Sequence, residues 1–98
     1  MAFKLIWSPT AKFDLHDLCE YIRQDNPSAA IHFAESVFAI VERLPDFPLS
    51  GRVVPEFADP NLREVIRKPC RIVYRVSSQN ERVEIVRVWY AARGIPEI

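Results

Sequence analysis

The chain has 98 residues, which suits one compact domain and excludes multi-domain enzymes and repeat arrays. Hydrophobic residues make up 49% and charged residues 27%, a balance that argues against intrinsic disorder. Thirteen basic and thirteen acidic residues cancel to a net charge of zero, which does not by itself suggest a polyanionic partner. We expect a single domain over residues 1–98.

The N-terminal quarter of the chain predicts a short strand and then a helix. Residues 2–7 alternate like a strand, and Ser8-Pro9 marks a helix start, because the serine oxygen accepts an orphan N–H and proline lacks that donor. The helix should run to about Gln24. Its inward stripe steps by four, three and four residues: Ala11, Leu15, Leu18 and Ile22. Its acidic residues should face away: Asp14, Asp17 and Glu20.

A second helix should follow through a tight turn, because Asn26-Pro27 repeats the same start signal, and it should end at Pro45. Its inward stripe consists of Ala30, Phe33, Val37, Ile40, Val41 and Leu44. His16 and His32 fall outside both stripes and are expected at the surface. Residues 45–62 hold four prolines and Gly51 without a sustained period, which predicts a long loop that either has a function or simply crosses the surface.

Three strands are predicted in the last third of the chain, at residues 63–67, 71–77 and 82–90. In the middle one Arg71, Val73 and Arg75 share one face, and the alternate residues form a core face. In the last one Val83, Ile85, Arg87 and Trp89 should share a face opposite Val86, Val88 and Tyr90. The expected fold is α+β: a strand, a helical hairpin and three antiparallel strands, with both helices on one face of a small sheet and a shallow arginine-rich surface opposite.

Charge is divided unevenly along the chain. Residues 1–62 hold five basic and nine acidic residues, and residues 63–98 hold eight basic and four acidic ones, which gives net charges of −4 and +4. The C-terminal part therefore either meets an acidic partner, nucleic acid or protein, or merely has solvated strand faces.

No targeting or metal-binding segment is apparent. The longest apolar runs are five residues, at 37–41 and 88–92, far below the roughly 20 that span a bilayer. Lys4 and Pro9 interrupt any signal-peptide core, so we expect a cytoplasmic protein with no membrane association. Cys19 and Cys70 lie in no metal-ligand spacing, and we expect reduced thiols, no metal and no cofactor.

A metal-free ribonuclease is harder to exclude than a nucleophilic triad, a phosphate-binding loop or a metal site. It needs a base for the 2′-hydroxyl, an acid for the leaving oxygen and cations on the phosphate. Glu56 or Glu64 could act as the base, Tyr90 as the acid, and the C-terminal arginines as the cations. The alternative for Arg63 and Glu64 is a cross-strand or loop-anchoring pair, and Gly51-Arg52 and the two tryptophans are expected to serve loop shape and packing.

An ordered set of motifs over nearly the whole chain resembles the RelE/ParE superfamily of bacterial type II toxins. The motifs are Trp7-Ser8-Pro9-x-Ala11 with Asp14-Leu15, Tyr21-Ile22, Asn26-Pro27-x-Ala29-Ala30, Gly51-Arg52 with Pro55-Glu56, Leu62-Arg63-Glu64, Arg71-Ile72-Val73-Tyr74-Arg75-Val76, and Val86-x-Val88-Trp89-Tyr90-Ala91-Ala92-Arg93. The resemblance implies the fold described above, an antitoxin that forms a hetero-oligomer with the chain, and one of two targets. ParE-like members poison DNA gyrase, and RelE-like members cleave messenger RNA on the ribosome.

The ParE-like interpretation is favoured over the RelE-like one. Only a RelE-like chain would be an enzyme, an endoribonuclease, so whether the chain is an enzyme stays open. RelE-like nucleases are strongly basic, whereas Arg52 is the only basic residue between Pro45 and Leu62. Many relatives also have histidine where Tyr90 stands. The further alternative is an inactive or divergent binding module.

Each interpretation assigns residues. A RelE-like site would use Arg71, Arg75, Tyr90 and Glu64. The expected antitoxin contacts are Arg63, Arg71, Arg75 and Arg93. Candidate contacts with the target are Arg52, Arg87 and Tyr90.

Overall fold

The computed structural model describes residues 2–98 and confirms an α+β fold. Its elements are β1 (Lys4–Trp7), α1 (Pro9–Asp25), α2 (Pro27–Arg43), β2 (Arg52–Val53), β3 (Leu62–Arg67), β4 (Cys70–Ser77), β5 (Arg82–Tyr90) and the 3-10 turn η1 (Ala91–Arg93). The predicted bounds agree with these to within about two residues, and β5 matches them at both ends. The short strand β2 was not predicted, because two residues are too few to show a period.

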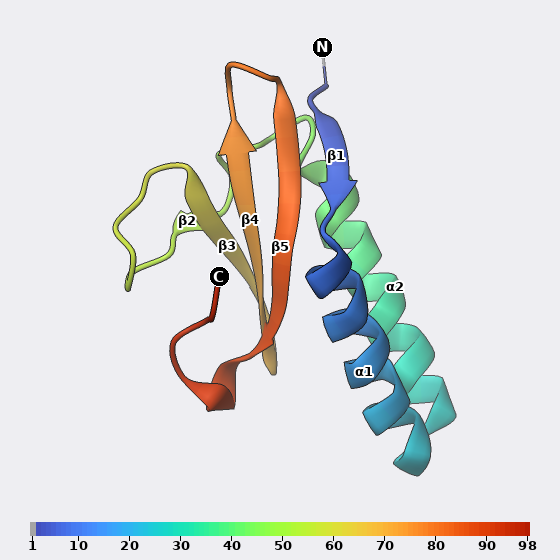
Figure 1. Ribbon diagram of the computed structural model, residues 1–98. Coiled ribbons are helices and arrows are strands. Elements are labelled where there is room, and N and C mark those ends of the chain that lie inside the picture. The colour runs from blue at the N-terminus through green and yellow to red at the C-terminus, as the bar shows by residue number, and fades with distance from the viewer. Residues whose placement is uncertain (1) are drawn as a thin grey trace.

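One five-stranded sheet organises the molecule, in the order β1-β5-β4-β3-β2. β1 runs parallel to β5, and the remaining pairs are antiparallel, so the predicted meander of the last three strands is confirmed. The helical hairpin between β1 and β2 lies on one side of this sheet (Figure 1). None of the helices in residues 2–98 has the length and apolar character needed to cross a membrane.

Both helices begin where the sequence places their caps. Ser8 Oγ accepts the N–H of Ala11 at 3.0 Å, and Asn26 Oδ1 accepts the N–H of Ala29 at 3.1 Å. The helices and the inner face of the sheet enclose the main core, which includes Phe33, Val37, Ile72 and Ile85. The two helix stripes therefore pack as predicted.

A β-bulge at Val86 changes the faces of β5. Ile85 pairs with Tyr74 and Arg87 pairs with Val73, so Val86 has no partner on β4. After this extra residue the alternation is reversed, and Val88 joins Val83 and Ile85 in the main core. The predicted division of this strand was therefore wrong beyond Ile85. The mostly apolar sequence on both sides of Val86 hides the insertion.

The outer face of the sheet is not the open arginine-rich surface that the sequence predicted. The loop between α2 and β3 folds back over it and forms a second small core from Val54, Leu62 and Val73, with Val86 packed against it. Arg71 is buried beneath this loop, although Arg75 stays exposed. The expectation failed because a period of two identifies faces but not what covers them.

Gly51 fixes how closely the loop approaches the sheet. Its N–H donates to Tyr74 Oη at 2.9 Å, and that hydroxyl donates to the carbonyl of Pro48 at 2.9 Å. A Cβ on Gly51 would lie 2.6 Å from both Tyr74 Oη and the carbonyl oxygen of Glu64. Gly51 therefore shapes the loop, as the sequence analysis expected.

Candidate functional site

Four of the charged residues singled out by sequence form a continuous ion-pair network on the outer face. Glu64 lies at its centre with a side chain that is 0% exposed. Its Oε1 accepts Arg71 Nε at 2.6 Å, and its Oε2 accepts Arg52 Nε at 2.7 Å. Arg71 completes the network by donating both terminal nitrogens to Glu56, at 2.7 and 3.0 Å. Loop and sheet are thus joined by charge-assisted hydrogen bonds.

The bond between Arg71 and Glu56 favours the charged forms of both side chains. The bidentate bond from Arg71 holds the pKa of Glu56 below its ordinary value of 4.5. The bonds to Glu56 and Glu64 in turn raise the pKa of Arg71, so its guanidinium stays charged. Both carboxylate oxygens of Glu64 are engaged by arginines beneath the loop, so the geometry does not place Glu64 to reach a substrate as a general base.

The two arginines beside the network differ in how free they are. Arg63 donates to the carbonyls of Pro60, Gly51 and Leu49, at 2.9, 3.0 and 3.3 Å, so its side chain anchors the loop. Arg75 has a side chain that is 44% exposed and only a loose ion pair with Asp59, at 3.9 Å. Arg63 and Glu64 both anchor the loop, which is the structural alternative that the sequence offered for them. The two side chains do not bond to each other.

The residues proposed for a RelE-like site are divided between the two faces of the sheet: Glu64 and Arg71 bond to each other, but Tyr90 lies apart from them. Tyr90 pairs with Cys70 in the sheet, and the next residue, Arg71, pairs with Trp89. Because neighbours in a strand point to opposite faces, Tyr90 lies on the helix side and Arg71 on the outer side. The proposed acid is therefore separated from the proposed base and cations by the sheet itself. Within residues 2–98, no group of three or more metal-ligating side chains is suitably placed for an ion.

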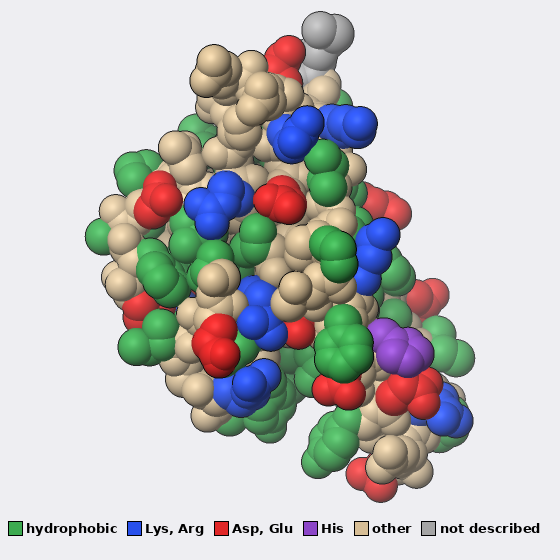
Figure 2. Space-filling view, in the orientation of Figure 1, with side chains coloured by type: hydrophobic (Ala, Val, Ile, Leu, Met, Phe, Trp, Pro, Cys, Tyr) green, Lys and Arg blue, Asp and Glu red, His purple; other side chains and the backbone are tan. Residues whose placement is uncertain are grey.

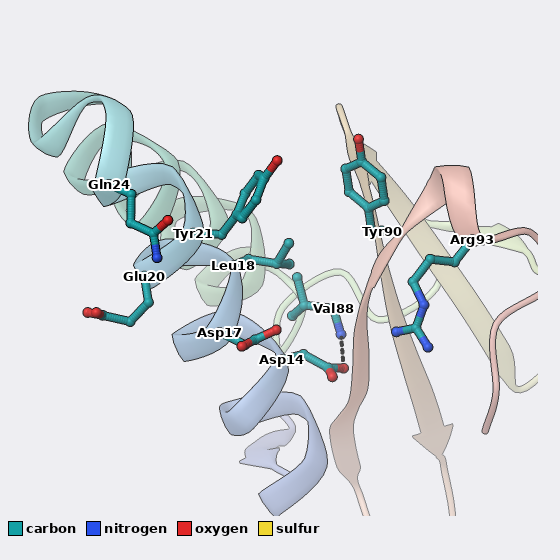
Figure 3. Close-up of a pocket in the computed structure, with 9 residues that line it drawn as sticks. All are labelled: Asp14, Asp17, Leu18, Glu20, Tyr21, Gln24, Val88, Tyr90 and Arg93. Atoms are coloured by element: carbon teal, nitrogen blue, oxygen red, sulfur yellow. Dashed lines mark hydrogen bonds between the residues drawn. The ribbon is translucent and has the colours of Figure 1, made fainter.

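Tyr90 instead lines a groove of about 390 Å³ between α1 and the end of β5, which we call the α1–β5 groove (Figure 3). Its lining is Asp14, Asp17, Leu18, Glu20, Tyr21 and Gln24 from α1, and Val88, Tyr90 and Arg93 from β5 and η1. The rings of Tyr21 and Tyr90 rise from opposite walls. In Figure 2 a notch separates the sheet from the far end of the helical hairpin.

Asp14 lies in the α1 wall of this groove, although the sequence predicted that it would face away from the rest of the protein. Its carboxylate accepts Arg87 Nε at 2.8 Å and Nη2 at 3.0 Å, and also the backbone N–H of Val88 at 3.0 Å. The hydrogen bonds that Arg87 donates to Asp14 raise the pKa of Arg87. The expectation that Asp14 faces away was wrong, because β1 ends at Trp7 and leaves the edge of β5 open to α1.

Trp89 supports Arg93 at the other wall. The indole is nearly buried, and its Nε1–H donates to the carbonyl of Gly94 at 3.0 Å. The guanidinium groups of Arg87 and Arg93 lie 4.8 and 4.2 Å from its ring centroid. Trp89 is thus a packing residue, as expected, and it holds both cations by cation–π contacts.

The groove joins two predicted residues, Tyr90 and Arg93, to α1 residues that sequence reasoning missed. Asp14, Asp17, Tyr21 and Gln24 recur at intervals of three or four, so they form a helical face next to the apolar stripe. This spacing, together with a tyrosine on an otherwise polar helix face, is the sequence feature that could have identified these residues as part of a site. Arg87 faces Asp14 and Trp89, and Arg52 lies in the separate network.

One family model matches the chain, and two solved structures share its fold. The family model of the ParE toxin of type II toxin-antitoxin system, parDE, matches residues 5–95. A chain of the chromosomal ParDE toxin–antitoxin system of P. aeruginosa superposes with a TM-score of 0.73 at 21% identity, covering 91% of this chain and 96% of that one. A chain of the toxin–antitoxin complex RelBE2 of Mycobacterium tuberculosis gives a TM-score of 0.59 at 23% identity, with 92% and 99% covered. No curated protein matches the chain.

Proposed function

The chain belongs to the family of ParE toxins of type II toxin–antitoxin systems, and from this premise we propose that it arrests bacterial growth by inhibiting DNA gyrase. The activity is proposed to be exerted in the cytoplasm, where gyrase works, and to be neutralised by a cognate antitoxin that binds the chain as a hetero-oligomer.

One observation supports gyrase over messenger RNA as the target. A metal-free ribonuclease must place a base, an acid and cations around one phosphate. Here Glu64 and Arg71 neutralise each other in a buried network, and Tyr90 lies on the opposite face of the sheet. Of the residues proposed for a RelE-like site, Glu64 and Arg71 are therefore occupied by each other, and Tyr90 is separated from them by the sheet.

Antitoxin binding is proposed to use the arginines that remain exposed. Of the four residues expected from the sequence, Arg75 and Arg93 have accessible side chains, Arg63 is bonded to the loop, and Arg71 is buried. Acidic side chains of a flexible antitoxin segment would find Arg75 and Arg93 without first breaking the network.

Purified components test the target directly. We expect the chain to inhibit DNA supercoiling by gyrase and to leave messenger RNA intact in a reconstituted translation reaction. Cleavage of ribosome-bound messenger RNA with unaffected gyrase would assign the RelE-like activity instead. An effect in neither reaction would leave a binding module.

A further inference from the structure

The sheet ends in two edge strands, and they are protected unequally. β2 has only two residues, so the edge that it forms is short. β1 lies at the other end of the strand order and has four residues, with neither a proline nor a bulge among them (Figure 1). Short length, prolines and bulges are features that keep an exposed edge from pairing with another chain. β1 is therefore the edge that is suited to accept a further strand.

Two residues of β1 direct their backbone groups away from the sheet. The N–H of Lys4 points toward β5, where it donates to the carbonyl of Glu81 at 2.8 Å. Since backbone groups of successive residues in a strand point to opposite sides, Leu5 and Trp7 direct theirs outward. Within residues 2–98, neither of them makes a backbone hydrogen bond on that side. The edge thus offers unpaired donors and acceptors.

The side chains along this edge are only partly covered. Leu5 and Trp7 pack at the margin of the main core and are half-buried, whereas Val83 and Ile85 beside them on β5 are 0% exposed. The ring of Trp7 lies 5.8 Å from that of Phe38 in an edge-to-face arrangement, and Phe38 is 46% exposed. The core therefore ends here in an apolar margin that another strand would cover.

The open length of the edge indicates which strand fits. The edge is closed at Phe3, whose N–H already donates to a loop carbonyl at 2.9 Å, so only Leu5–Trp7 is open. Its outward groups lie symmetrically about Ile6. An antiparallel second copy with a two-fold axis at Ile6 places Leu5 opposite Trp7 of that copy, and Trp7 opposite its Leu5. Each of these pairs exchanges two N–H···O bonds, so every outward group of both copies is satisfied.

We propose that β1 pairs antiparallel with β1 of a second copy of the chain, so that the two sheets join across a two-fold axis at Ile6. On the helix side Leu5 packs against Trp7 of the second copy, next to the exposed Phe38, and on the outer side Ile6 meets its own counterpart. Lys4, the only charged residue of β1, lies at the end of the ladder, so no like charges meet. The contact is small, and we expect dissociation in the micromolar range. The inference does not depend on the proposed target.

Amide hydrogen exchange of the purified chain, measured by NMR, tests the register. The amides of Leu5 and Trp7 should exchange about tenfold more slowly in a concentrated sample than in a dilute one, because only the dimer bonds them. The amides of Lys4 and Ile6 point toward β5 in either state and should change much less. Sedimentation equilibrium of the same samples should show a mass that rises toward that of two chains.

Two lysine variants form a matched pair for the contact. Ile6 and Ile66 both lie on the outer face of the sheet, but Ile66 is on β3 and is 45% exposed. Ile6→Lys places like charges across the axis and should weaken self-association at least about tenfold, whereas Ile66→Lys should stay within about twofold of the parent chain. Mixing Ile6→Lys with Ile6→Glu should restore the dimer, and circular dichroism checks that each variant is folded.

Three results would overturn the inference. The chain could stay monomeric at about millimolar concentration. It could self-associate while the exchange of the Leu5 and Trp7 amides stays unchanged, or with equal losses in Ile6→Lys and Ile66→Lys, and either result would place the contact elsewhere. None of the three bears on the inhibition of gyrase, which is measured separately.

Discussion

Glu64 holds the loop between α2 and β3 against the sheet, because it pairs with Arg71 on the strand and with Arg52 in the loop. Its side chain is fully buried, so its removal would leave the nearly buried guanidinium of Arg71 only partly neutralised. A buried charge that loses its partner is strongly destabilising, whereas an exposed partner is worth little.

We therefore expect Glu64→Ala to lower the free energy of unfolding by about 3 kcal/mol or more. Arg52→Ala is the matched control, since its side chain is 59% exposed and Glu64 keeps its bond to Arg71 without it. The control should cost no more than about 1 kcal/mol. Urea unfolding measures both, and similar losses in the two variants would mean that the network does not stabilise the fold.

Glu56 makes the stability of the fold depend on pH in the acid range. Its pKa is held below the ordinary value of 4.5 by the bond from Arg71, so the unfolded chain takes up this proton first as the pH falls. Its contribution to stability is complete above pH 4.5 and is lost as the pH falls through the lowered pKa.

Glu56→Gln should consequently flatten the stability curve below about pH 4.5 relative to the parent chain, because glutamine does not titrate. Thermal unfolding across that range measures the difference. Parallel curves for the parent and Glu56→Gln would show that this carboxylate contributes nothing to the acid response.

At the scale of elements, the sequence predicted the helices and the main strands well because their signals are local. Ser8-Pro9 and Asn26-Pro27 start the helices, and the spacing of apolar residues identifies the buried stripes. The bulge at Val86 and the burial of Arg71 could not be predicted in this way. Both depend on which residue lies opposite in space, and Arg71 is neutralised by residues 7 and 15 positions away along the chain.

The candidate site was likewise predictable from the sequence only in part. Tyr90 and Arg93 were identified by their residue types, but their neighbours on α1 come from the opposite end of the chain. Asp14 was assigned to solvent because its position lies off the apolar stripe, although it is the residue that joins α1 to β5. Only the packing of helix against strand edge reveals this role.

Asp14→Ala tests that junction. It would leave the N–H of Val88 and the guanidinium of Arg87 without their carboxylate, and we expect a loss of about 2 kcal/mol in the free energy of unfolding. Asp17→Ala, one turn along the same helix and exposed, should stay within about 0.5 kcal/mol of the parent. Chemical denaturation distinguishes the two, and indistinguishable midpoints would contradict the role of Asp14.

On the scale of the whole molecule, the net charge and the arrangement of the basic side chains both bear on the kind of partner that the chain can bind. The net charge is zero, and five of the eight basic residues beyond position 62 donate hydrogen bonds within the chain or stack on its aromatic rings, while Arg75 makes a loose ion pair with Asp59. A ligand as anionic as the ribosome is bound mainly through free cationic side chains. The fold is thus better equipped to bind a protein than to compete for RNA.

Induced expression of the chain in bacteria that lack its antitoxin tests the central claim most directly. Incorporation of labelled thymidine and of labelled amino acids would be followed over the first minutes after induction. Inhibition of gyrase predicts that DNA synthesis falls first while translation continues. An early fall in amino-acid incorporation with DNA synthesis still intact would contradict the gyrase proposal.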